Sequence, residues 1–81
     1  MIADTRTAER RAERLQIGQN IRRLRAKCGI SQSELAHSIG VQQSIVSTME
    51  TGMGDVSARR LARLSSALGC DASEILEGVP L

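Results

Sequence analysis

Four polar residues in the middle of the chain have the spacing of one exposed face of a helix: Gln43, Ser44, Ser47 and Thr48. A glutamine amide can form two hydrogen bonds with adenine, and a hydroxyl can bond to either type of base, when a helix enters the major groove. Val46 and Met49 would lie on the inner side of this helix, and Ile45 would point outward. The pattern favours a helix that contacts the bases of duplex DNA, although the same residues would also solvate an exposed helix.

Two short helices joined by a tight turn, within residues 31–50, would position this face. Ser31 and Glu34 have the spacing of a capping box, in which each side chain bonds to the other residue's backbone amide. The first helix has an apolar face made of Leu35, Ala36 and Ile39. Gly40 can adopt the positive φ at which many helices end. The second helix is expected from Gln42 to Met49.

Three further helices complete an all-α, compact five-helix bundle, and no strand is expected. The first helix runs from about Gln16 to Lys27, with apolar residues at helical spacing on one face. The fourth begins after Ser57 as its N-cap and ends near Leu68. Asp71 would cap a short fifth helix.

The chain divides into a basic extension at residues 1–14, one helical domain at residues 15–78 and a tail at residues 79–81. The extension contains good helix formers, and Asp4 or Thr7 could cap a helix there. It can continue the first helix, form a separate small helix or be a disordered arm. The sequence leaves these three possibilities open.

The composition excludes several classes of protein. With 81 residues the chain has room for one domain with a small core. It has no apolar run of membrane-spanning length and no secretory signal, so we expect a cytoplasmic protein without membrane contact. Cys28 and Cys70 are too few for a disulfide scaffold, and their spacing to His37 fits no metal site. Catalytic spacings and phosphate-binding glycine loops are absent, so neither an enzyme nor a cofactor is expected.

Two features of the composition point to duplex DNA. The chain has no Phe, Tyr or Trp, whereas single-strand and RNA-binding modules stack bases on aromatic rings. Residues 1–27 hold eight Arg or Lys against three acids, a net charge of +5, and residues 28–81 hold three against six, a net charge of −3. The basic half fits a footprint on phosphates. The alternative is that the arginines of residues 6–14 coat a solvated helix and pair with Glu9 and Glu13.

The chain resembles the phage-repressor or Cro-like (Xre) helix-turn-helix family from about Ile17 to Leu76. The resemblance rests on residue types in order and at the family's spacing: Ile17-Gly18, Ile21-Arg22, Leu24-Arg25, Gly29 to Gln32, Leu35-Ala36, Gly40-Val41, Gln43-Ser44, Ser47, Glu50, Gly52, Ser57, Leu61, Leu64 and Ala67 to Gly69. It implies a lambda-repressor-like fold in which residues 15–78 form the DNA-binding domain. The helix from Gln42 would be the recognition helix.

The resemblance also implies roles for individual residues. Base contacts would come from the exposed face of the recognition helix: Gln43, Ser44, Ser47 and Thr48. Gln32, at the start of the preceding helix, would contact a DNA phosphate. Arg25 and Glu50 would form a structural pair that fixes the angle of the recognition helix.

Two positions depart from the family pattern. Gln42 stands where the family often has a serine N-cap, and glutamine is a poorer cap. The loop at residues 53–56 contains Asp55, where the family often has basic residues and a proline. We therefore expect phosphate contacts from Arg59, Arg60 and the backbone near Thr51.

These features predict a sequence-specific regulator of transcription, bacterial or from a phage, that binds double-stranded DNA. A repressor acting as a homodimer on an inverted repeat is expected, because one small domain contacts only a few base pairs. The expected dimer surface is the apolar set near the C-terminus: Ala72, Ile75, Val79 and Leu81. The N-terminal helix is the alternative dimer element. An antitoxin or another protein-interaction module with this fold, whose main partner is a protein, is the alternative function.

Overall fold

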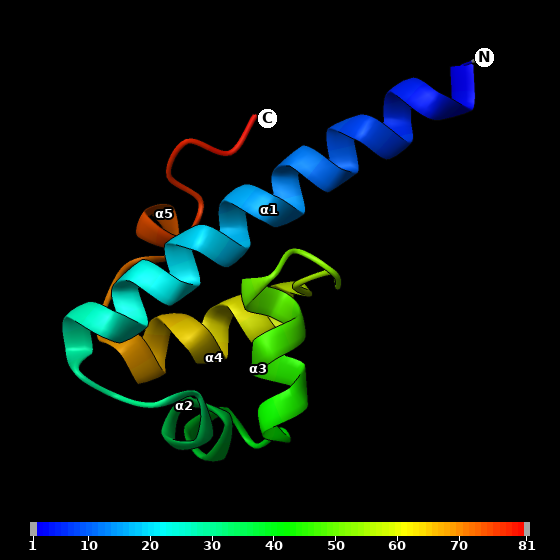
Figure 1. Cartoon of the computed structure of the whole chain (residues 1–81). Coiled ribbons are helices and arrows are strands. Elements are labelled where there is room, and N and C mark those ends of the chain that lie inside the picture. Colours follow the sequence, from blue (N-terminus) through cyan, green and yellow to red (C-terminus); the bar gives the residue numbers. More distant parts are fainter. Residues whose placement is uncertain (1, 81) are drawn as a thin grey trace.

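The computed structural model describes the backbone of residues 2–80 and the side chains of residues 7–80. Within this part of the chain every regular element is a helix: α1 (Ile2–Cys28), α2 (Gln32–Ile39), α3 (Gln43–Glu50), α4 (Ala58–Leu68) and α5 (Ala72–Ile75). Figure 1 shows α1 as a long rod lying across the other four helices. The predicted all-α, five-helix fold is confirmed. No helix in the described part is long and apolar enough to cross a membrane.

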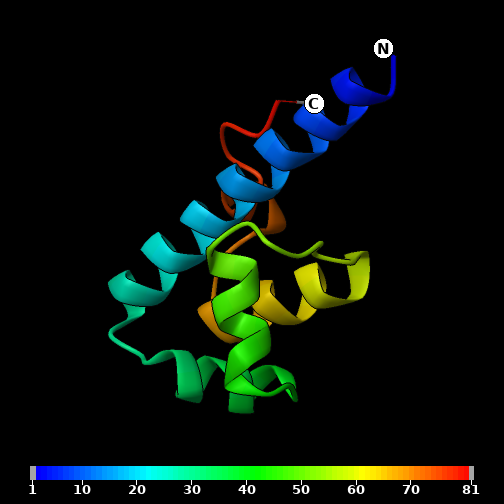
Figure 2. The ribbon, with the colours of Figure 1, turned by 45° about the vertical axis from the view of Figure 1, so that its right-hand side comes forward.

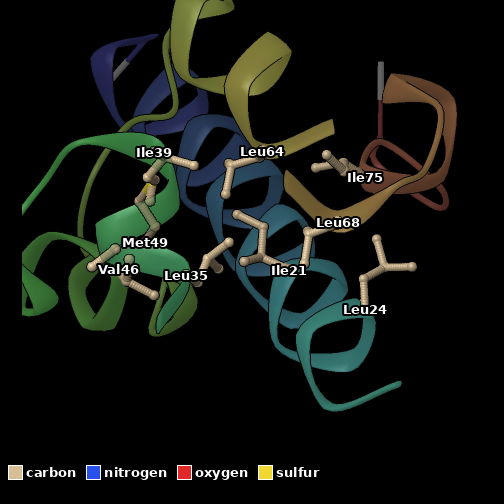
Figure 3. Packing of buried hydrophobic residues seen from close by; sticks show 10 residues of the cluster. Ile21, Leu24, Leu35, Ile39, Val46, Met49, Leu64, Leu68 and Ile75 are labelled. Carbon is tan, nitrogen blue, oxygen red and sulfur yellow. The ribbon is translucent and has the colours of Figure 1, made fainter. Parts of the chain in front are cut away.

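One core joins all five helices, and Figure 3 shows its side chains converging. Each helix supplies one side chain with no exposed surface: Ile21, Leu35, Val46, Leu64 and Ile75. Burying a side chain of this size contributes about 1.5–3 kcal/mol. The core is therefore built from aliphatic residues and Met49, as a chain without aromatic residues requires.

Local capping sets the bounds of α2 and α4 as the sequence predicts. The Ser31 hydroxyl accepts a hydrogen bond from the Glu34 amide at 3.0 Å, and the Glu34 carboxylate accepts one from the Ser31 amide at 3.0 Å. The hydrogen bonds from Ser31 hold the pKa of Glu34 below its usual value. Gly40 ends α2 with a φ of 72°. Ser57 caps α4 by accepting from the Arg60 amide at 3.2 Å.

The first helix is much longer than the predicted one, which began near Gln16. It starts at Ile2, so of the three possibilities for residues 1–14 the structure has the continuation of the first helix. A helix of 27 residues is about 40 Å long. Figures 1 and 2 show its N-terminal half projecting beyond the other helices. With this projection included, the molecule measures 42 by 23 by 20 Å.

The α5 segment is held against α1 by an asparagine that the sequence gave no reason to select. The Asn20 amide nitrogen donates to the carbonyl oxygens of Ile75 at 2.8 Å and Glu77 at 2.7 Å. Asn20 is itself buried, and its side-chain oxygen accepts from Gln16 at 3.1 Å. These bonds satisfy carbonyls at the end of a helix only four residues long.

One of the predicted dimer contacts is wrong. Ile75 is completely buried inside the protomer, between α1 and α4, so it has no surface to offer a partner. Ala72 and Val79 are half-buried, and Leu81 lies outside the described residues. The apolar side chain at position 75 looked unpartnered in the sequence because its partners lie far away along the chain.

Candidate nucleic-acid interface

The predicted base-contacting residues lie together on the outer face of α3. Gln43, Ser44 and Thr48 are exposed and Ser47 is half-buried. The Thr48 hydroxyl donates to the Ser44 carbonyl at 2.7 Å, so its oxygen remains an acceptor on this face. Ile45 does not point outward as expected, because it is half-buried and packs against the core.

A chain of hydrogen bonds runs from the start of α3 to Arg25, near the C-terminal end of α1. The Gln43 amide nitrogen donates to the Gln32 side-chain oxygen at 3.4 Å. The Gln32 nitrogen in turn donates to the Glu50 carboxylate at 3.0 Å, and Glu50 is bound by Arg25. The Gln43 oxygen accepts from the Ser33 hydroxyl at 3.3 Å. The two glutamines singled out in the sequence are thus parts of one network.

Arg25 and Glu50 form a bidentate ion pair at the centre of this network. Arg25 Nε lies 2.6 Å from Glu50 Oε2, and Arg25 Nη2 lies 3.1 Å from Glu50 Oε1. The Arg25 side chain is 16% exposed and that of Glu50 only 3%. Arg25 Nη1 also donates to the Ile30 carbonyl at 2.9 Å. The pair therefore ties α3 to α1 and to the start of the α1–α2 link.

The two ionised groups stabilise each other. Burial disfavours the charged form of Glu50, but the hydrogen bonds from Arg25 and Gln32 and the charges of Arg25 and Arg22 outweigh it and lower the pKa of Glu50. The hydrogen bond with Glu50 raises the pKa of Arg25. Both groups are therefore ionised at neutral pH.

Acid is expected to weaken the fold through Glu50. Because its pKa is lower in the folded than in the unfolded chain, the unfolded chain binds more protons as the pH falls. The stabilisation is present above the usual carboxylate pKa of about 4.3 and is lost as the pH falls through the lowered value. Thermal melts between pH 7 and pH 3 should show Glu50→Gln less stable than wild type at pH 7 but losing less stability on acidification. An identical slope in both proteins would contradict this role, and Glu9→Gln is the exposed control.

The backbone near Thr51 is not free to bind phosphate. The amides of Thr51, Gly52 and Met53 donate to carbonyls of the last turns of α3, at 3.0–3.2 Å. The Thr51 hydroxyl donates to the carbonyls of Ser47 and Thr48, each at 3.1 Å. These donors complete the end of α3, so the phosphate role predicted for Thr51 is not retained. Arg59 and Arg60 lie in the first turn of α4, exposed and half-buried respectively.

The loop after α3 is anchored to α1 by contacts that the sequence did not reveal. Arg14 pairs with Asp55 at 3.5 Å and donates to the Gly52 carbonyl at 3.4 Å. Leu15 lies directly on Gly52, where an added Cβ would come within 2.7 Å of Leu15 Cδ2. The only advance signal was opposite charge on residues that are 41 positions apart.

The order and pairing of these helices match known proteins. A family model described as helix-turn-helix matches residues 21–75. The chain belongs to the helix-turn-helix family. Its resemblance to the Xre or Cro-like regulators is therefore confirmed. The protein is a DNA-binding regulator of transcription.

Individual relatives are similar over most of this helix-turn-helix chain. Control protein C.BamHI of Bacillus amyloliquefaciens is 32% identical over 65 residues, which cover 79% of this chain and 80% of the relative. The restriction-modification controller protein C.AhdI from Aeromonas hydrophila superposes with a TM-score of 0.77 and 34% identity, covering 80% of this chain and 94% of that one. The clp gene regulator ClgR from C. glutamicum superposes with a TM-score of 0.76 and 33% identity, covering 79% of this chain and 83% of that one.

Proposed function

We propose that this protein binds duplex DNA sequence-specifically as a homodimer and represses transcription from an inverted-repeat operator. In each half-site α3 lies in the major groove. The observation that carries the proposal is the hydrogen-bonded network that fixes Gln43 on the exposed face of α3 and ties it to the buried Arg25–Glu50 pair. The protein recognises DNA and performs no reaction on it.

The network leaves Gln43 with the groups that adenine requires. A glutamine amide has two N–H donors and an oxygen with two lone pairs. One donor is used by Gln32 and one lone pair by Ser33, so one donor and one acceptor remain. Adenine presents an acceptor at N7 and a donor at N6 in the major groove. Holding the side chain in advance reduces the rotamer entropy lost on binding, which is about 0.5–1.5 kcal/mol for a flexible side chain.

Gln32 is suited to a phosphate. Its side-chain oxygen accepts from Gln43, and one N–H is donated to Glu50, which leaves its second N–H for a ligand. The residue is also the first of α2, where the helix dipole favours an anion. A phosphate there would fix the register of α3 without selecting a sequence.

The names of two relatives favour a particular kind of regulator. C.BamHI is a control protein and C.AhdI a restriction-modification controller. Both are covered over at least four-fifths of their own length. We extend the role of a small controller of this kind to the present chain. Asp55 of the acidic loop pairs with Arg14, so the loop gives no support to the alternative of a protein-interaction module.

Selection of bound duplexes from a random-sequence pool tests the proposal. At about 0.15 M salt, enrichment of an inverted repeat is expected, with half-sites about one helical turn apart. Sedimentation of the complex should show two protein chains on each selected duplex. A folded protein that enriches no sequence would overturn the proposal and direct attention to a protein partner.

Two glutamine variants should separate base contact from phosphate contact. Gln43→Ala is expected to lower discrimination at one base pair of each half-site by about 1–3 kcal/mol, while affinity for unrelated duplexes stays unchanged. Gln32→Ala should weaken unrelated duplexes as well as the operator, with an additional loss on the operator because it releases Gln43. Gln19→Ala, at an exposed glutamine on α1, should change neither. Competition binding with single-base operator variants measures both effects. Unchanged discrimination in Gln43→Ala would rule out its contact with a base.

A further inference from the structure

The α1 extension borders the recognition helix through a basic hollow. Residues of α1 and of the loop after α3 line a depression of about 270 Å³: Arg11, Arg14, Leu15, Thr51, Gly52 and Met53. Leu15 and Met53 are 42% and 78% exposed, the two large apolar residues that stand out on the described surface. Figures 1 and 2 show α1 passing this loop and continuing beyond it on the side of α3.

The two arginines of this hollow are in different situations. Arg14 is only 25% exposed and is engaged with Asp55 and the Gly52 carbonyl. Arg11 lies one turn earlier and is exposed, and the ion pairs of residues 7–80 do not include it. Arg14 therefore offsets the charge of the loop acid, and Arg11 remains available to an external anion.

Among the residues whose side chains the structure describes, the two acids near Arg11 point elsewhere. Glu9 and Glu13 are each two residues from Arg11, which places them about 200° around the helix from it. Glu13 lines a separate hollow with Arg10, Arg14 and Asp55. The α1 residues that line the hollow at the end of α3 consequently carry positive charge, from Arg11 and Arg14.

The loop after α3 offers no cation to a phosphate. Residues 51–56 contain no Lys or Arg, and the amides of residues 51–53 are bonded to α3 carbonyls. A helix lying in the major groove has phosphates on both flanks. Gln32 lies on the flank of α3 that faces α2, where it bonds to Gln43 and Glu50. Arg11 lies beside the loop that leaves α3, in the hollow with Thr51 and Gly52.

We propose that Arg11 binds a DNA phosphate beside the C-terminal end of α3, so that the extension of α1 supplies the cation that the loop lacks. This inference rests on the proposed function. The guanidinium is suited to the role because its planar fork forms paired hydrogen bonds with phosphate oxygens. The contact adds affinity for any duplex and does not distinguish sequences.

Salt-dependent binding of the full chain tests this contact. Affinities for the selected operator and for an unrelated duplex are measured between about 0.05 and 0.3 M salt. Arg11→Gln is expected to weaken both duplexes about tenfold per protomer. It should also reduce the slope of log affinity against log salt by about one per protomer. Arg11→Lys should keep most of the slope, because the charge remains.

The matched control is Arg23→Gln, which makes the same charge change on the same helix. Arg23 lies on the side of α5, where it pairs with Glu77 at 3.7 Å with both side chains more than half exposed. Its loss should leave stability and the salt slope nearly unchanged. Circular dichroism and sedimentation of each variant confirm that folding and assembly are intact.

The outcomes separate the two proposals. A wild-type protein with no affinity for duplex DNA would remove the proposed function together with this inference. Wild-type binding, with Arg11→Gln indistinguishable from Arg23→Gln, would overturn the inference alone. A change of assembly in Arg11→Gln but not in Arg23→Gln would also overturn it, because the hollow would then be a contact between protein chains.

Discussion

Gly18→Ala is expected to destabilise the protein by about 3 kcal/mol, even though alanine is the better helix former. A Cβ atom on Gly18 would lie 2.4 Å from the Met49 carbonyl oxygen and 2.7 Å from that of Glu50. Both are backbone atoms of the last turn of α3, so no side-chain rotation can relieve the overlap. The helices must move apart where α1 crosses the end of α3.

The two opposing effects differ in size. Replacing glycine by alanine inside a helix stabilises it by about 1 kcal/mol. Overpacking a tight interior contact typically costs about 1–3 kcal/mol, and here the obstacle is the backbone itself, so a cost of about 4 kcal/mol is reasonable. The net loss of about 3 kcal/mol would lower the melting temperature by roughly 12–24 °C in a domain of this size.

Thermal and urea unfolding, followed by circular dichroism, measure this loss. Gln19→Ala, at the exposed neighbouring position, is the control and should melt within a few degrees of wild type. DNA binding of Gly18→Ala at about 10 °C should also be weaker, because the angle of α3 has changed. Wild-type stability in Gly18→Ala would show that α1 and α3 do not approach so closely in solution.

Local signals in the sequence located α2 and α4 well. Ser31 and Glu34 are three residues apart, and Ser57 caps the helix that follows it directly. Such contacts depend on neighbouring residues and a few backbone angles, so spacing alone reveals them. The face of α3 was equally readable, because side chains that alternate inward and outward at helical spacing need no knowledge of their partners.

Contacts between distant residues were not readable. Gly18 gave no local signal of its contact, because α1 runs through it and its missing side chain admits the backbone of α3. The extension could have been helical or disordered. The contacts of Arg14 and Leu15 with the loop fix the point from which the helix continues outward. Ile75 was assigned to the surface because nothing near it in the sequence revealed the cavity between α1 and α4 that it fills.

Some features of the candidate site could likewise be predicted from the sequence, and others could not. The polar residues of α3 and the Arg25–Glu50 pair follow from spacing and from resemblance. The connection between Gln43 and that pair through Gln32 does not, because it requires the start of α2 to lie beside both ends of the network. In the structure the candidate contact residues Gln43 and Gln32 are therefore joined to the buried ion pair by hydrogen bonds.

The Arg25–Glu50 pair should matter more for positioning α3 than for stability. Arg25→Met alone leaves the Glu50 carboxylate, 3% exposed, without its cation and should cost about 3–4 kcal/mol. Glu50→Leu alone leaves Arg25 uncompensated and should cost about 2–3 kcal/mol, because Arg25 retains some access to water. The double variant should lie within about 1–2 kcal/mol of wild type, because two apolar side chains of similar volume can fill the space.

DNA binding is expected to respond differently. In the double variant Gln32 loses its acceptor on Glu50, and the Ile30 carbonyl loses its donor on Arg25. Gln43 is then held by a Gln32 side chain that is itself free to rotate. We expect the operator affinity of the double variant to remain at least tenfold below that of wild type, although its folding is largely restored.

A double-mutant cycle, measured for unfolding and for operator binding, separates the two roles. The exposed pair Arg23–Glu77, changed to Met and Leu, is the control and should show almost no coupling in either cycle. If the buried double variant binds the operator like wild type, the network does not position Gln43. If its instability equals the sum of the single changes, the two charges do not act as a pair. Recovery of folding without recovery of binding would assign the buried ion pair to recognition. The pair would then act through Gln32, which bonds to Glu50, on Gln43, which does not contact the pair.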